Sequence, residues 1–546
     1  MTSVVSPRGA PRIVSATWTS RFRLLLVAGW ITSLSIAFLA GALVFRQRKE
    51  IRNFIGTTLR GRVIQSNLYN IAVKTIRIPG EGRDGGIDAL DDGLLLANRL
   101  GAMWFVTSSR ELHPLRVQIP VNIQEFNNDP YNKTTDFRDQ FGVKDILVQR
   151  RASGVRLLAS YNYWYPEKHC YALRVAGVET TASEIRSARQ LSWRNLFETT
   201  PCLQLEGSDA VHTPTRDAGG RLVALSNNQI LLSVGRFGTD SGVDLASSRV
   251  TDFSKGPQSL DNSYGKTILI DTDRGTSRIY TSGHRNPEGM AAAPDGTVYL
   301  TEHGPRGGDE LNRIVEGRNY GWPIVTYGTQ YDSMIWSTNP AQAHHEGFEK
   351  PIYAWVPSIG TSQLIVVRGK AFSKWEGDLL VSSLAAESLF RVRLAESRAV
   401  VIEPISIDHR IRDVAELSDG TIALKTDDDF LLFLDPIDAT HMADLSQEAR
   451  GKVIATACAG CHSLAADGTD GIGPALWGIV GRKIASRKGF AYSPALASMG
   501  GKWTRDRIRA FISDPSSVAP GTQMQLNATY DSKTLDDLVA FLATLH

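Results

Sequence analysis

The sequence predicts an all-β six-bladed propeller, with one transmembrane helix before it and a small all-α domain after it. Three observations carry this prediction: short apolar runs alternate with polar turns over residues 57–436, residues 24–45 carry no charge, and residues 535–545 have helical spacing. Sixty Lys and Arg stand against 57 Asp and Glu among 546 residues, so no strong field favours a nucleic-acid partner. Four cysteines are too few for a disulfide-dense scaffold.

The first segment is expected to be an uncleaved membrane anchor at residues 24–45, with residues 1–23 in the cytoplasm. About 20 apolar residues cross the hydrocarbon core of a bilayer, and Arg or Lys residues bracket this segment on both sides. An Ala-Gly-Ala string at 40–42 leaves a cleaved signal peptide as the alternative.

The middle segment, residues 57–436, is expected to close into a ring of blades. Runs such as DILVQ, QILLSVG, GTVYLTE and GTIALKTD alternate with turns, and Asp-Gly pairs stand in several of them, at 92–93, 295–296 and 419–420. At about 50–70 residues per blade, this length gives six blades. A pair of β-sandwiches is the alternative.

The final segment, residues 448–546, carries a covalent haem signature and follows a linker at 437–447. Its Cys-x-x-Cys-His string lets two thiols bond to one haem while the histidine coordinates the iron; the three residues are Cys458, Cys461 and His462. Met524, in the loop APGTQM, is the expected sixth ligand, and Met499 is the alternative. A zinc site is disfavoured because no second cysteine pair lies nearby.

With these strings in view, residues 451–546 resemble a class I c-type cytochrome of the mitochondrial kind. The strings CAGCH, GIGPALWGIVGRK, GFAYSPALASMGGKW and PGTQM carry the resemblance in that order. It implies that Pro474 orients His462 through a hydrogen bond. It also implies three residues that bind the haem propionates: Arg482, Tyr492 and Trp503.

Two positions depart from this cytochrome pattern. Phe511 stands where the family usually has a tyrosine, and Leu496 stands where it usually has an asparagine. The distal pocket is therefore expected to be drier and poorer in hydrogen bonds.

The haem also predicts the location of the protein. Covalent attachment of this kind takes place outside the cytoplasm in bacteria, so the bulk of the chain is expected in the periplasm, held to the inner membrane by a single-pass anchor. Cys170 and Cys202 would then lie in an oxidising compartment. A disulfide between them and two buried free thiols both remain open.

Three blocks of the middle segment carry a second resemblance. They are GHRNPEGM at 283–290, TEHGPRGGDELN through NYGWP at 301–323, and HRIRDVAELSDGTIALKTD at 409–427. These blocks resemble the soluble glucose and aldose-sugar dehydrogenases that use pyrroloquinoline quinone, also called the sorbosone dehydrogenase family. The resemblance implies a six-bladed propeller with the quinone over its central channel.

The same blocks supply the residue types that such a quinone needs. Guanidinium groups can bind its carboxylates in a bidentate manner, and side-chain amides can hydrogen-bond its oxygens. The candidates are Arg285, Asn286, Arg410 and Arg412, with Gln140 matched to a family glutamine. Backbone carbonyls of Gly304 and Pro305 lie in a tight loop and suit Ca2+. By resemblance, that calcium bridges to the quinone.

Three departures weaken the dehydrogenase pattern. Asp217 stands where the family has the histidine that takes the substrate's hydroxyl proton, and Arg216 beside it would lower its pKa. Arg236 stands where the family usually has aspartate, and Ala385 where it commonly has a quinone-binding lysine.

Two functions follow. In the first, the chain is an oxidoreductase: a sugar or alcohol is oxidised at the quinone, haem c receives the electrons, and a redox partner such as a terminal oxidase or another cytochrome takes them on. In the second, the chain is an electron-transfer cytochrome whose propeller has lost catalysis and serves as a binding or scaffold module. Whether the chain is an enzyme stays open between them, while haem-based electron transfer is common to both.

Overall fold

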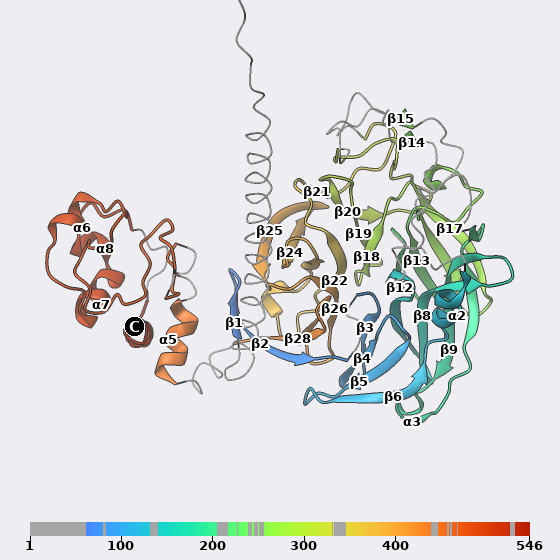
Figure 1. Ribbon diagram of the computed structural model, residues 1–546, viewed down its shortest axis with the longest axis horizontal. Helices are drawn as coiled ribbons and strands as arrows, with labels where there is room; N and C mark the ends of the chain where they lie inside the picture. Colours follow the sequence, from blue (N-terminus) through green and yellow to red (C-terminus); the bar gives the residue numbers. More distant parts are fainter. Residues whose placement is uncertain are drawn as a thin grey trace, which may run out of the picture. The chain divides into compact units, whose positions relative to one another are not determined.

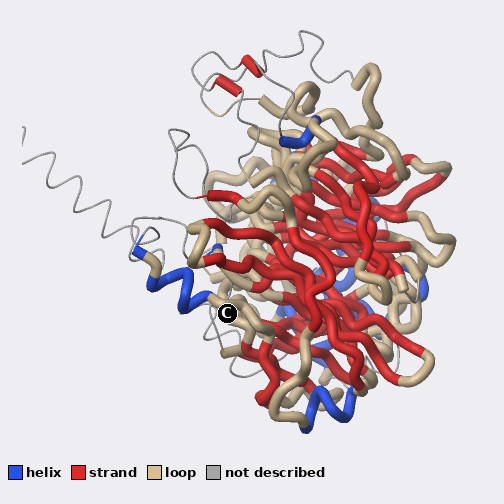
Figure 2. The backbone as a smooth tube through the Cα atoms, turned by 90° about the vertical axis from the view of Figure 1, so that its right-hand side faces the viewer, coloured by secondary structure: helices blue, strands red, loops and turns tan. Residues whose placement is uncertain are grey.

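Six antiparallel sheets follow one another along the chain and form a ring in the computed structural model (Figure 1), and Figure 2 shows the same strands after a 90° turn. The structure describes residues 62–79, 83–130, 140–204, 217–226, 228–237, 243–244, 249–250, 256–329, 331, 345–437, 446–455, 458, 461–466, 468–524 and 530–546. The first strand of each sheet contacts the first strand of the next, and β26 of the last sheet contacts β3 of the first. The predicted six-bladed propeller is therefore the observed fold, and the pair of sandwiches is not.

The first five blades each use four strands in chain order, apart from short insertions in the second and third. Blade one is β3 (Gly86–Leu90), β4 (Gly93–Ala97), β5 (Ala102–Val106) and β6 (Leu112–Gln118); blade two is β7 (Val143–Arg151), β8 (Gly154–Tyr165), β9 (Cys170–Thr180) and β10 (Arg194–Glu198), with β11 (Leu203–Gln204) on β9. Blade three is β12 (Gly219–Ala224), β13 (Gln229–Val234), β16 (Lys266–Asp271) and β17 (Thr276–Ser282); blade four is β18 (Pro287–Ala292), β19 (Val298–Glu302), β20 (Asp309–Ile314) and β21 (Tyr353–Trp355); blade five is β22 (Thr361–Val366), β23 (Leu379–Ser383), β24 (Ser388–Ala395) and β25 (Arg398–Ser406).

The sixth blade closes the ring with strands from both ends of the propeller segment. Its inner strands are β26 (Ile411–Glu416), β27 (Ile422–Thr426) and β28 (Phe430–Pro436), and its outer strands are β2 (Asn70–Arg77) and β1 (Arg62–Gln65). β2 pairs antiparallel with β28 from Ile71–Pro436 to Arg77–Phe430. This pairing ties the start of the ring to its end.

Hydrophobic clusters join each blade to its neighbour. Leu231 of blade three and Leu300 of blade four share one cluster, and Leu380 of blade five and Leu424 of blade six share another. The four other pairs of neighbouring blades each share a cluster in the same way. Both faces of inner strands such as β4, β23 and β27 are consequently buried, which explains their continuous apolar runs.

The Asp-Gly pairs noted in the sequence stand at hairpin turns. Gly296 joins β18 to β19 with φ 85°, and Gly420 joins β26 to β27 with φ 91°. Glycine occupies this left-handed region at the least steric cost.

Short elements complete the propeller segment: α2 (Ile123–Asn128), α3 (Ala182–Ser187), the hairpin of β14 (Val243–Asp244) and β15 (Arg249–Val250), and two 3₁₀ turns at Gly256–Gln258 and Ser373–Trp375. Cys170 and Cys202 form a disulfide next to the pairing of β9 with β11. The choice that the sequence left open is therefore decided for the disulfide.

In the described part of the C-terminal domain, the regular elements are helices. Its helices are α5 (Gln447–Ala455), α6 (Pro494–Ser498), α7 (Arg505–Ser513), α8 (Pro515–Val518) and α9 (Ser532–Leu542). α5 packs on α9, where a Cβ on Gly451 would collide with the carbonyl of Asp537. Arg450 Nε lies 2.6 Å from Asp537 Oδ2 across the same contact. The predicted closing helix at 535–545 is α9, shifted a few residues toward the N-terminus.

The predicted anchor at residues 24–45 lies outside the described residues, as does most of the predicted linker at 437–447. Within the described part of the chain, no helix is both long enough and apolar enough to cross a membrane.

Candidate functional site

The residues predicted for the quinone gather where the first strands of several blades begin. Arg285 and Asn286 directly precede β18, Asp217 lies two residues before β12, and Arg412 is the second residue of β26. Gln140 lies three residues before β7, and its carbonyl accepts a hydrogen bond from Lys144 Nζ at 2.5 Å. The ring thus brings together side chains that are far apart in the sequence.

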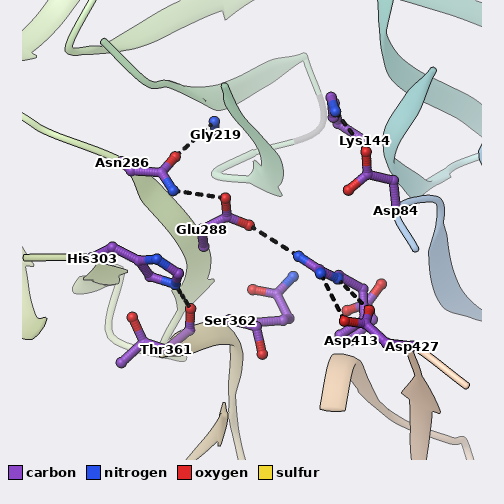
Figure 3. A network of polar contacts seen from close by, with 12 residues as sticks. Asp84, Lys144, Gly219, Asn286, Glu288, His303, Thr361, Ser362, Asp413 and Asp427 are labelled. Carbon is purple, nitrogen blue, oxygen red and sulfur yellow. Dashed lines mark hydrogen bonds and ion pairs between the residues drawn. The ribbon is translucent and has the colours of Figure 1, made fainter. Parts of the chain in front are cut away.

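We call the end of the ring where these first strands begin the propeller mouth. A chain of polar contacts runs from blade three to blade six at this mouth (Figure 3). Gly219 N–H donates to Asn286 Oδ1 at 3.2 Å, and Asn286 Nδ2 donates to Glu288 Oε1 at 2.9 Å. Glu288 Oε2 lies 3.9 Å from Arg412 Nη1. Arg412 in turn binds Asp427 through both Nε and Nη2, at 2.8 and 3.0 Å. The side chains of Asn286 and Arg412 are therefore held in place by the protein itself.

Arg410 shares Asp427 but remains accessible. Its Nε lies 3.2 Å from Asp427 Oδ2, and its side chain is 49% exposed. Its Nη1 donates to the carbonyl of Leu384 at 3.3 Å. Because Leu384 precedes Ala385, a cation still adjoins the position where the resemblance expects a lysine.

Arg285 lines a small pocket that opens to solvent, together with Glu302, His303, Gly304 and Trp322 among others. Its Nη1 donates to the carbonyl of His303 at 3.3 Å, and its guanidinium lies 5.3 Å from the centre of the Trp322 ring. Arg285 Nε is buried and has no hydrogen-bond partner among the described residues. A buried, charged donor without an acceptor fits a carboxylate ligand, because leaving it unpaired costs free energy.

Asp217, predicted as the weak replacement for the family's base, is surrounded by cations. Arg236 Nε and Nη2 lie 2.9 and 2.8 Å from its Oδ2, and Arg285 Nη2 lies 3.9 Å away. Burial alone would raise the pKa of Asp217, but Arg285 and Arg236 lower it to about 2. Arg216 lies outside the described residues, so the cations seen beside the carboxylate are Arg236 and Arg285.

The Gly304–Pro305 loop offers carbonyl oxygens rather than a carboxylate cluster. Asp309 is buried and accepts hydrogen bonds from Gly304 N–H at 3.1 Å and Gly360 N–H at 2.6 Å. The carbonyls of Gly304 and Pro305 accept no hydrogen bond from the described residues, which fits a hard cation. No group of three or more His, Cys, Asp or Glu in the described ranges could hold a metal ion.

Several members of the site were missed from the sequence: Glu288, Trp322, Asp427 and Lys144. The first three stand inside the quoted blocks, so their position was a usable signal. Lys144 stands outside these blocks, and its Nζ contact with Asp84 Oδ2 at 2.7 Å joins two blades.

The haem residues lie on a tight turn of the C-terminal domain. His462 N–H donates to the Cys458 carbonyl at 2.9 Å, and Cys461 N–H donates to the same carbonyl at 3.1 Å. His462 Nδ1 lies 2.7 Å from the Pro474 carbonyl. The Nδ1–H donates to that carbonyl, which leaves Nε2 for a metal. A Cβ on Gly473 would collide with the His462 ring. This donor set fits a covalently bound haem.

The residues predicted for the propionates lie close together. Trp503 N–H donates to the Arg482 carbonyl at 2.8 Å, and Tyr492 interacts electrostatically with Arg482. Arg482 Nη1 donates to the Ala475 carbonyl at 2.8 Å. Phe511, the departure from the family tyrosine, packs with its ring centre 5.2 Å from that of Trp503. Their contacts with a haem stay predictions.

Comparison with known proteins places both segments. Residues 86–432 match the family described as Glucose / Sorbosone dehydrogenase, and residues 448–546 match the Cytochrome c family. The chain is 31% identical to the aldose sugar dehydrogenase YliI of Escherichia coli over 191 residues. This match covers 31% of this chain and 50% of that protein. Over 109 residues it is 40% identical to a cytochrome c homolog of Rickettsia bellii, covering 20% of this chain and 63% of the relative.

The chain thus spans less than two-thirds of the length of either curated relative. The crystal structure of the soluble aldose sugar dehydrogenase from Escherichia coli, in the apo-form, is similar in fold. It is 22% identical with a TM-score of 0.53, covering 67% of this chain and 99% of that one.

Proposed function

Because the chain belongs to the glucose/sorbosone dehydrogenase family and carries a C-terminal cytochrome c domain, we propose that it oxidises a sugar or an alcohol at the propeller mouth and passes the electrons to haem c. One observation carries the proposal: Arg285 lines a pocket at this mouth with a buried donor that lacks an acceptor among the described residues. A haem site on the same chain gives the electrons an acceptor at high effective concentration.

Within this proposal, each residue has a limited task. Bound pyrroloquinoline quinone would supply the two-electron chemistry that side chains lack. Arg285 and Arg410 would bind its carboxylates, and the carbonyls of Gly304 and Pro305 would hold Ca2+. Asn286 and Arg412 would orient the site through Glu288 and Asp427, their partners at 2.9 and 2.8 Å.

We also infer that the chain is anchored in a bacterial inner membrane, with its bulk in the periplasm. The support is the uncharged segment at residues 24–45 and the site of covalent haem attachment in bacteria. The electrons would then leave the haem for a redox partner such as a terminal oxidase or another cytochrome.

A second function, an electron-transfer cytochrome with a non-catalytic propeller, is favoured by Asp217. A base works best when its pKa lies near the working pH. Burial opposes the ionisation of Asp217, yet Arg285 and Arg236 lower its pKa to about 2. Under this alternative the propeller mouth would bind a ligand or a partner without oxidising it.

Calorimetric titration of the chain with pyrroloquinoline quinone and Ca2+, followed by aldose addition, separates the two functions. Quinone binding and aldose-dependent haem reduction support the dehydrogenase. We expect Arg285→Gln to weaken quinone binding roughly tenfold or more, because it removes a charge-assisted contact. Arg278→Gln is the matched control, since Arg278 is exposed on the outer strand β17 and pairs there with Glu316 from another strand's end. Quinone binding without haem reduction would favour the second function.

A further inference from the structure

Two departures from the family pattern, at positions 217 and 236, form one ion pair in space. Asp217 lies just before β12, and Arg236 lies just after β13. Two nitrogens of Arg236 approach Asp217 Oδ2 within 2.9 Å. Their backbones are joined as well, because Phe237 N–H donates to the Asp217 carbonyl at 3.1 Å. The two positions where the resemblance expects a histidine and an aspartate therefore hold a carboxylate and a guanidinium group that pair with each other.

The same carboxylate reaches the pocket through Arg285. Arg285 Nη2 lies 3.9 Å from Asp217 Oδ2, and the Arg285 carbonyl accepts a hydrogen bond from Arg236 N–H at 2.9 Å. Both guanidinium groups also lie over one indole, 5.3 and 5.8 Å from the centre of the Trp322 ring. A carboxylate and an aromatic face thus hold two arginines side by side.

In this arrangement the Asp217 carboxylate contacts two guanidinium groups, and Arg285 Nε remains buried without an acceptor among the described residues. A planar guanidinium that is already oriented loses little freedom when a carboxylate binds. The cluster is consequently suited to receive an anion and poorly suited to accept a proton.

We propose that Asp217 is a positioning residue, which orients Arg285 and Arg236 for a planar polycarboxylate ligand, and not the base of the reaction. The inference rests on the proposed quinone site and describes how that site is prepared. It changes the expected effect of Asp217 substitutions, because they should weaken ligand binding before they alter any proton transfer.

The test measures binding by calorimetry on the full haem-loaded chain, with two probes. The first is pyrroloquinoline quinone with Ca2+, and the second is pyridine-2,4,6-tricarboxylate, a redox-inert planar tricarboxylate. We expect Asp217→Asn to weaken binding of both probes roughly tenfold or more. Asp217→Glu keeps the charge and should recover most of the affinity. Arg236→Gln removes the same ion pair from the other side, so it should reproduce the loss.

The control is Asp419→Asn. Asp419 lies 3.9 Å from Arg110, in the turn between β26 and β27, at the opposite end of β26 from Arg412. This substitution should leave the affinity for both probes unchanged. Thermal unfolding of each variant checks that it is folded, and a variant that is not folded is replaced by its counterpart on the other side of the pair.

Two outcomes would overturn the inference. In the first, Asp217→Asn binds quinone as tightly as the native chain but loses turnover, which is the behaviour of a base. In the second, the tricarboxylate binds with an affinity that does not depend on Asp217, or does not bind at all. Failure of quinone binding together with Asp217-dependent tricarboxylate binding would refute the proposed dehydrogenase and leave the positioning role standing.

Discussion

Met499 and Met524 both lie partly buried against the core of the haem domain, so burial does not decide which one ligates the iron. Their backbones differ. Met499 caps α6 in a helical conformation, whereas Met524 ends a loop closed by a hydrogen bond from Thr522 N–H to the Ala519 carbonyl at 2.9 Å. Met524 N–H also donates to Thr522 Oγ1 at 3.3 Å. A loop fixed in this way can hold a thioether in one direction.

Replacing Met524 with alanine should therefore remove the thioether ligand of the haem iron. We expect the weak far-red absorption of the oxidised thioether-ligated haem to disappear and the reduction potential to fall, since Met ligation raises it. Met499→Ala is the matched control and should keep the far-red band. Loss of the band in the Met499 variant alone would show that the ligand has been assigned to the wrong residue.

Single residues also show where sequence reasoning ends. The sequence predicts Arg285 and Arg412 as site residues because they stand in the quoted blocks and guanidinium groups bind carboxylates. It could not predict their partners, since Asp427, just after β27, reaches Arg412 on the neighbouring strand β26, and Asp217 reaches Arg236 across the neighbouring strands β12 and β13. The sequence predicts a low pKa for Asp217 from its neighbour Arg216, whereas the structure shows Arg285 and Arg236, which the fold brings to the carboxylate, as the groups that lower its pKa.

At the scale of elements, the inner strands of the blades are joined by buried polar residues. Arg221 of β12 lies 3.2 Å from Asp145 of β7 and 3.1 Å from Asp413 of β26. Asp145 accepts a hydrogen bond from Leu222 N–H at 2.8 Å, and Asp413 accepts one from Ile87 N–H at 2.9 Å. Each carboxylate thus satisfies a backbone donor of another blade. Burial, opposed by Arg221 and supported by Asp413, raises the pKa of Asp145 to about 7.

This shift predicts how the stability of the propeller depends on pH. Because the folded pKa of Asp145 lies above the unfolded value of about 4, the native state binds more protons between these values, and stability falls as the pH rises through them. Asp145→Asn removes this contribution. Between about pH 5 and about pH 8, the native chain should lose roughly 2 kcal/mol more free energy of unfolding than the variant.

Urea unfolding followed by far-UV circular dichroism measures this difference in pH dependence. Asp295→Asn, at the exposed turn between β18 and β19, serves as the control and should retain the native loss over the same range. An Asp145 variant that loses as much stability as the native chain would contradict the assigned protonation.

At the scale of the whole molecule, the chain has separate cores. Among the described residues, six hydrophobic clusters join neighbouring blades, and a seventh, which includes Leu538 and Phe541, contains residues of the helical domain alone. The sequence predicted both domains because strand-turn recurrence and the haem signature are local. It could not show that β2 closes the last blade, since that pairing joins residues more than 350 positions apart.

Separate cores predict separate unfolding transitions, and the closing strand provides the test. Val73 is buried in β2, between β1 and β28, and pairs with Leu434. Val73→Pro removes a backbone donor from the sheet, which leaves a buried acceptor unpaired and should destabilise the propeller by about 1–3 kcal/mol. The far-UV transition should then move to lower temperature, while the transition reported by haem absorbance should stay in place, because the helical domain packs around its own cluster. Val73→Ile, which keeps the strand, should move neither transition far. If the proline variant shifts both signals together, the two cores unfold as one cooperative unit and the domains do not fold independently.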